Sequence, residues 1–135
     1  MKKQLFALLG LGLLLATVSA SAQTVMLKAN VPFNFIVSGK TLPAGEYTIQ
    51  SLNTIARVLV LRGAEKADMV IANPCQSARP SDKSKLVFHR YGDRYFLSQI
   101  WTAGNSSGAE FPQSSREAEV AMDFPRQEVV LIASR

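Results

Sequence analysis

Cysteine is nearly absent from this 135-residue sequence, which contains a single one, Cys75. A lone cysteine excludes an intramolecular disulfide framework, so a hydrophobic core must hold the fold together. Histidine is equally scarce, with His89 its only occurrence. A metal site needs several ligands close together, whereas Asp82, Asp93 and Asp123, for example, stand isolated in the sequence. The sequence therefore predicts no zinc site, no calcium site and no cofactor.

Charge of one sign is never concentrated in this chain. The formal net charge is +5, and acidic and basic residues are interleaved. This pattern predicts neither a nucleic-acid partner nor an anionic-membrane partner. The sequence also lacks a phosphate-binding glycine loop and the G-x-S-x-G pattern of a nucleophile elbow.

The first 22 residues have the composition of a secretory signal peptide. Lys2 and Lys3 precede an apolar run over residues 5–18, and Ala20 and Ala22 follow it as small residues at alternate positions. The run is shorter than the roughly 20 apolar residues that span a bilayer, and no later run reaches that length. We expect cleavage after Ala22, no transmembrane segment in the product, and one exported domain over 23–135, periplasmic or extracellular.

Period-two alternation dominates the start of this domain. Every odd position from Val25 to Val37 is apolar, which indicates a strand with one face in a core. Pro32 cannot donate a ladder hydrogen bond, so we expect the strand to break or bulge there. Further on, Tyr47 and Ile49 alternate with polar residues and are predicted to point inward.

Shorter segments complete the expected secondary structure. Apolar runs predict strands over 57–62, 67–72 and 128–133. Residues 73–84 are interpreted as an exposed loop because they are rich in Pro, Ser, Asp and Lys, and residues 102–113 as a loop of Gly, Ser and Asn. Cys75 would be a free thiol in the first loop. Ser114 and Glu117 form a capping box that predicts a helix through about Met122, and Pro125 prevents its continuation.

The strongest local signal is a hairpin, in which strands 85–91 and 94–101 flank Gly92-Asp93. A two-residue loop with glycine first indicates a tight turn and fixes the register. It predicts three cross-strand pairs: Tyr91 with Arg94, His89 with Phe96, and Val87 with Ser98. One face would then carry Leu86, Phe88, Tyr95, Leu97 and Trp101, and the other Val87, His89, Tyr91, Phe96 and Ile100.

Six or seven short strands and one late helix predict a mainly β fold. We expect an antiparallel β-sandwich or a small barrel with one short C-terminal helix before the last strand.

Three motifs carry a family resemblance: VPFNF from Val31, LPAGEY from Leu42, and FHRYGDRYFL from Phe88. Together they resemble a group of small exported bacterial proteins with a VPF-x-F opening, an LPAG-x-Y turn and an F-H-x-Y-G hairpin. The group has no assigned activity. The resemblance therefore implies a compartment and a β-rich fold, and it transfers no catalytic residue.

No set of residues predicts an enzyme. A triad of Ser98, His89 and Asp93 would need mutual hydrogen bonds, which the predicted register does not supply. Glu117 and Glu119 cannot act as a glycosidase pair, because residues two apart on a helix point in different directions. We therefore predict no catalytic residue, and His89 is interpreted as packed beside Phe96 or at a sheet rim.

The remaining candidate is a ligand or partner surface of Tyr91, Arg94, Tyr95 and Trp101, with Tyr91 and Tyr95 the most exposed. We expect an exported, non-enzymatic β module that binds a protein, a glycan or an envelope component, or that contributes to the envelope. A small β-barrel carrier of an apolar ligand and a hydrolase using His89 are the alternatives.

Export gives the first testable prediction. Mass spectrometry of the secreted or periplasmic protein should find a mature N-terminus at Gln23, since the small residues at Ala20 and Ala22 fit a signal peptidase. Retention of Met1 would contradict export.

Overall fold

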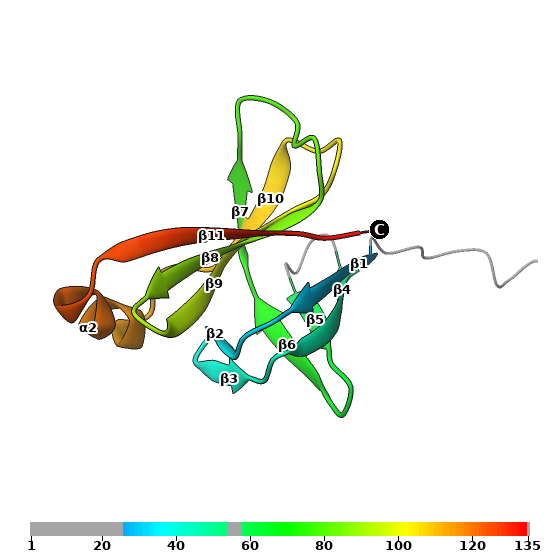
Figure 1. Ribbon diagram of the computed structural model, residues 1–135. Coiled ribbons are helices and arrows are strands. Elements are labelled where there is room, and N and C mark those ends of the chain that lie inside the picture. The colour runs from blue at the N-terminus through cyan, green and yellow to red at the C-terminus, as the bar shows by residue number, and fades with distance from the viewer. Residues whose placement is uncertain (1–25, 54–57, 135) are drawn as a thin grey trace, which may run out of the picture.

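The computed structural model describes residues 26–53 and 58–134, so Val25, Thr54 and Arg57 lie outside the described residues. The described chain is mainly β, as predicted, and forms two open sheets and one helix (Figure 1). The sheets do not close into a barrel. No helix in this part of the chain is long and apolar enough to cross a membrane.

Each sheet brings together segments that are distant in sequence. The first sheet has four strands, in the order β1 (Met26–Val31), β4 (Gly45–Asn53), β5 (Val58–Arg62) and β6 (Ala67–Ile71). The main path of the second sheet runs β11 (Arg126–Ile132), β8 (Lys85–Tyr91), β9 (Arg94–Trp101), β10 (Ser107–Glu110) and β7 (Asn73–Gln76). The short strand β2 (Phe35–Val37) adds to this sheet parallel to β9, and β3 (Lys40–Leu42) pairs with β2.

Three short segments pass from one sheet to the other and tie them together, the one over residues 43–44 leading from β3 back to β4 (Figure 1). The predicted break at Pro32 is confirmed, since β1 of the first sheet ends at Val31 and β2 of the second begins three residues after Pro32. Likewise β6 continues into β7 after Ala72 alone. At the end of the described chain, Ser134 exchanges two backbone hydrogen bonds with Lys28 of β1.

The core lies between the facing sides of the sheets. Tyr47 and Ile49 point inward as predicted, and Phe88 is fully buried among aromatic rings. Phe33 and Phe35 each meet the Phe88 ring edge-on, at centroid distances of 5.0 and 5.6 Å. Burying one such side chain contributes about 1.5–3 kcal/mol, which a fold without disulfides requires.

The predicted hairpin forms, but its register is correct only near the turn. Tyr91 pairs with Arg94 and His89 with Phe96, around a turn in which Gly92 has φ 63°. The pairing of Val87 with Ser98 is wrong, because β9 bulges and Val87 pairs with Gln99.

The bulge exchanges the faces of the residues beyond it. An extra residue in one strand moves every later side chain to the opposite side of the sheet. Ile100 therefore joins the core, and Trp101 lies on the outer face, the side of the second sheet turned away from the first. The predicted register was therefore wrong for both: it had placed Trp101 on the face of Leu86 and Phe88, and Ile100 on the opposite face.

Two expected loops each contain a strand, β7 and β10, which pair with one another. Their Pro, Ser and Gly content hides them from a propensity argument, and the pairing itself stabilises them. Pro74 is tolerated because β7 is an edge strand. Cys75 thus lies in a strand opposite Gly108, which corrects its assignment to a loop.

The helix α2 (Ser115–Asp123) forms as predicted. The Ser114 side chain accepts a hydrogen bond from the Glu117 backbone N–H, and the helix ends two residues before Pro125.

The contact between Gly108 and Trp101 gives a stability prediction. A Cβ atom at Gly108 would lie 2.7 Å from Trp101 Cε3 and 2.8 Å from the Ile100 carbonyl oxygen. Gly108→Ala should therefore lower the free energy of unfolding by about 1–3 kcal/mol, measured by urea denaturation. The control Ser107→Ala, at an exposed position of the same strand, should stay within about 0.5 kcal/mol of wild type. Equal stability of the two variants would refute this packing argument.

Candidate functional site

The helix α2 covers the hairpin end of the outer face. Val120 packs there with Ile36, Tyr91 and Phe96 in a small second core. Glu117, one helical turn earlier, is only 6% exposed. A buried carboxylate is costly unless it is hydrogen-bonded.

Glu117 finds its partners on β8. Its Oε2 accepts a hydrogen bond from the Tyr91 hydroxyl at 2.8 Å and lies 3.0 Å from His89 Nδ1. We call Glu117, Tyr91 and His89 the helix clasp, because they join α2 to the sheet through side chains alone.

The chemistry of the clasp favours anchoring. Burial, followed by the hydrogen bond and the charge of Glu117, raises the pKa of Tyr91 to about 12. A phenol that stays neutral is a donor and a poor nucleophile. Tyr91 is also only 1% exposed, so its predicted surface position is wrong.

The imagined triad is not assembled. His89 pairs across the hairpin with Phe96, as predicted, and its Nδ1 faces Glu117. Ser98 is buried at the bulge, while Asp93 is exposed in the turn. Among the described residues, no hydrogen bond joins His89 to either of them.

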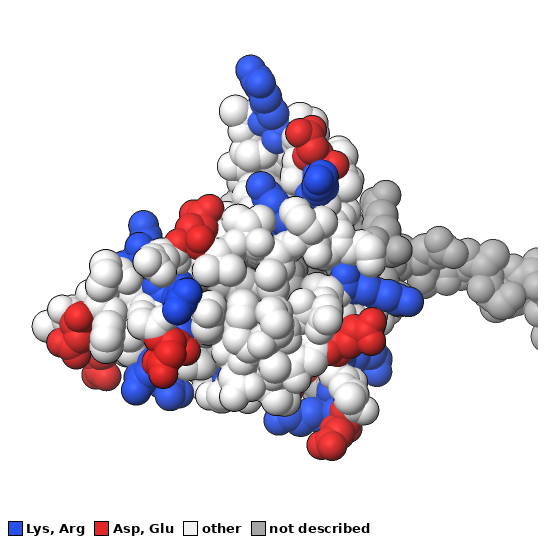
Figure 2. Space-filling view, viewed as in Figure 1, with Lys and Arg blue, Asp and Glu red and all other residues white. Residues whose placement is uncertain are grey.

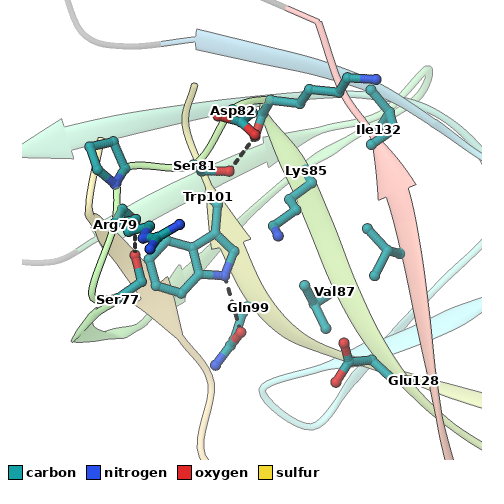
Figure 3. A pocket seen from close by; sticks show the side chains of 13 residues that line it. Ser77, Arg79, Ser81, Asp82, Lys85, Val87, Gln99, Trp101, Glu128 and Ile132 are labelled. Atoms are coloured by element: carbon teal, nitrogen blue, oxygen red, sulfur yellow. Dashed lines mark hydrogen bonds between the residues drawn. The ribbon is translucent and has the colours of Figure 1, made fainter. Parts of the chain in front are cut away.

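The other end of the outer face forms a groove of about 560 Å³ (Figure 3). Its floor consists of side chains from β8, β9 and β11: Lys85, Val87, Gln99, Trp101, Glu128, Val130 and Ile132. Its wall is the segment 77–83, which carries Arg79, Asp82 and Lys83. We call this feature the outer groove.

Backbone hydrogen bonds fix the wall to the neighbouring turn. Ser77 N–H donates to the Ser106 carbonyl at 2.9 Å, and Ser81 N–H donates to the Asn105 carbonyl at 3.1 Å. Gly104 N–H donates back to the Ser81 carbonyl at 2.7 Å. The wall is therefore held in place before any ligand arrives, which lowers the entropic cost of binding.

Trp101 is the part of the floor that lies beside the wall. Its ring packs over Gly108, and its Nε1–H donates to Gln99 Oε1 at 3.0 Å. Because the chain has one tryptophan, its fluorescence reports on this groove alone.

The floor combines exposed apolar groups with unpaired charges. Val130 is 45% exposed and Ile132 59% exposed. The salt bridges of the described residues are Lys40–Asp68 and His89–Glu117, so no charge of the outer groove has an ionic partner. Figure 2 shows acidic and basic side chains interspersed over the visible face, with no large area of one sign.

The four sequence candidates do not share one surface. Trp101 lines the outer groove, Tyr91 belongs to the helix clasp, and Arg94 is exposed at the hairpin turn. Tyr95 lies on the core side, stacked on Phe33 at a centroid distance of 3.7 Å, with Arg90 over its ring.

Sequence reasoning missed the rest of the outer groove. Lys85 and Glu128 come from strands far apart in sequence. The available signal was the shared face of Lys85, Val87 and His89 on one strand and of Glu128, Val130 and Ile132 on another.

Two other features have structural explanations. The Tyr47 hydroxyl donates to the Pro43 carbonyl at 2.5 Å, so the LPAG-x-Y motif closes its own turn. At Cys75, burial and then the charge of Glu110 raise the thiol pKa, against a lowering by the Gly108 backbone hydrogen bond. A raised pKa disfavours a reactive thiolate.

The clasp predicts an alkaline transition. Because the pKa of folded Tyr91 is about 12 against an ordinary value of 10, its contribution to stability is complete below pH 10 and is lost as the pH rises to 12. Tyr91→Phe should cost about 1–3 kcal/mol at pH 8, and the difference from wild type should shrink between pH 10 and 12. Urea denaturation at a series of pH values measures it, with Tyr95→Phe as control. A difference that is constant up to pH 12 would contradict the clasp.

Comparison of the sequence and structure with known families, curated proteins and solved structures finds no match, so the functional argument rests on the geometry of the chain.

Proposed function

We propose that the protein is an exported, non-enzymatic module that binds a peptide, glycan or lipid-derived ligand of the cell envelope in the outer groove. One observation carries the proposal. The outer groove is a concave surface that combines exposed aliphatic groups, charges without an ionic partner and a buried tryptophan. It lies between the wall and the floor strands, and both are held in place by backbone hydrogen bonds. Such a mixture of apolar lining and a few polar groups is typical of small-ligand sites.

The exposed apolar groups support a binding role. Val130 and Ile132 contribute less burial to the fold than core residues of their size. A ligand that covers these side chains removes apolar surface from water, and the free energy of this burial favours binding.

The outer groove is a better ligand site than the space between the sheets. A carrier of an apolar ligand needs an empty interior, whereas here the interior contains the packed side chains of Phe35, Phe88 and Leu97. A hydrolase using His89 is less well supported, because among the described residues no hydroxyl or thiol nucleophile is hydrogen-bonded to that histidine.

Binding should be visible in Trp101 emission. Short peptides, peptidoglycan-type oligosaccharides and phospholipid micelles are titrated into the processed protein, and at least one class should change the emission in a saturable way. Val130→Arg should weaken that response about tenfold or more, because the new side chain fills the groove.

Met122→Arg is the matched control. It makes the same kind of substitution at an exposed apolar residue, 85% exposed on α2, away from the outer groove. It should leave binding unchanged. If no class perturbs Trp101, or if the two variants respond alike, the proposal fails.

A further inference from the structure

The strand register places the charges of the groove floor in rows. In the pairing of β8 with β11, Lys85 lies opposite Ile132, Val87 opposite Val130, and His89 opposite Glu128. The members of each pair share a face, so the floor is cationic at one end, apolar in the middle and anionic at the other. Lys85 and Glu128 are separated by four strand residues, or about 13 Å between backbone positions.

The cationic end has an excess of positive charge. Half-buried Lys85 extends into the groove beside Trp101 (Figure 3). Arg79 and Lys83 belong to the wall. Asp82 is the one acidic residue among the lining groups of this end. No salt bridge neutralises these three cations within the described chain.

The opposite end presents Glu128 as an exposed carboxylate. His89, on the same face, is held by Glu117. Arg126, exposed at the start of β11, acts by its charge on the Tyr91 hydroxyl and lowers the pKa of that group. Glu128 itself has no ion-pair partner among the described residues.

We propose that the outer groove binds a short extended peptide of about four residues with free termini. This inference rests on the proposed function and names its ligand. An extended chain advances about 3.3 Å per residue, so four residues match the separation of the charged ends. The peptide carboxylate lies at Lys85 and Arg79, and the amino terminus lies at Glu128.

The middle of the groove suits the peptide between its termini. Val87 and Val130 meet an apolar side chain. The side-chain oxygen of Gln99 already accepts a hydrogen bond from Trp101 Nε1–H. The side-chain N–H groups of Gln99 therefore remain to donate to a carbonyl of the bound peptide. Opposite charges at the two ends and an apolar centre are the complement of this zwitterionic chain.

The test uses the peptide Ala-Val-Val-Ala in four forms: free, N-acetylated, C-amidated and blocked at both ends. Trp101 emission and titration calorimetry measure the dissociation constants. The free peptide should bind tightest, each single block should weaken binding about fivefold or more, and the double block should weaken it further. A dipeptide with free termini is too short to reach both ends and should bind about tenfold more weakly.

Two variants assign the ends. In Glu128→Gln, the free and the N-acetylated peptide should have the same dissociation constant, while C-amidation should still weaken binding. Lys85→Gln should reduce the sensitivity to amidation and keep that to acetylation. Far-UV circular dichroism and urea denaturation verify that both variants fold, and if either does not, the four forms tested on wild type decide alone.

The outcomes separate the two proposals. If glycans or micelles saturate the Trp101 signal and the peptides do not, the peptide assignment is overturned and the proposed function stands. Equal binding of the free and the doubly blocked peptides overturns the assignment of the termini. If nothing binds, both fail.

Discussion

The single extra residue in β9 decides what each part of the second sheet does. The bulge near Ser98 ends the regular alternation, and the Ser98 carbonyl accepts a hydrogen bond from Phe111 N–H at 2.8 Å, outside the ladder with β8. Beyond this point Ile100 turns into the core and Trp101 turns outward. Without the bulge the tryptophan would lie between the sheets and Ile100 would line the groove. A regular hairpin of the same sequence would therefore have neither this core nor this site.

The outer face is divided between two tasks because a sheet can be covered only in part by a nine-residue helix. At the hairpin end, α2 seals Tyr91 and Phe96, and the buried Glu117 is satisfied by two partners. At the other end the covering segment is a wall rather than a lid, since its hydrogen bonds run to residues 104–106 and not to the floor. His89 stands at the boundary, with the clasp on one side and the row of Glu128 on the other.

Local patterns were sufficient for the mainly β class, for the break at Pro32, for the helix cap at Ser114 and for the tight turn at Gly92. Each depends on residues within a few positions of one another. The bulge, β7 and β10 depend on pairing between distant segments. The residues of Asn73–Gln76 and Ser107–Glu110 have no strand propensity that would predict β7 and β10. The site was missed for the same reason. Trp101 was identified by its chemistry. Lys85, Arg79 and Glu128 form one site only because the fold brings β8, β11 and the wall together.

The charges of the groove also protect the open edge of β11 from pairing with another chain. β11 pairs with β8 on one side, and over Arg126–Ile132 the described chain provides no strand for its other edge. An open edge carrying exposed Val130 and Ile132 is prone to pair with another chain. Arg126 and Glu128 on the edge strand, with Lys85 beside it, oppose that pairing, because burying unpaired charge is costly. Only a partner that supplies the opposite charge at each end escapes this cost. In the proposed peptide complex, the same side chains that protect the edge would thus also select the ligand, with no contribution from the core.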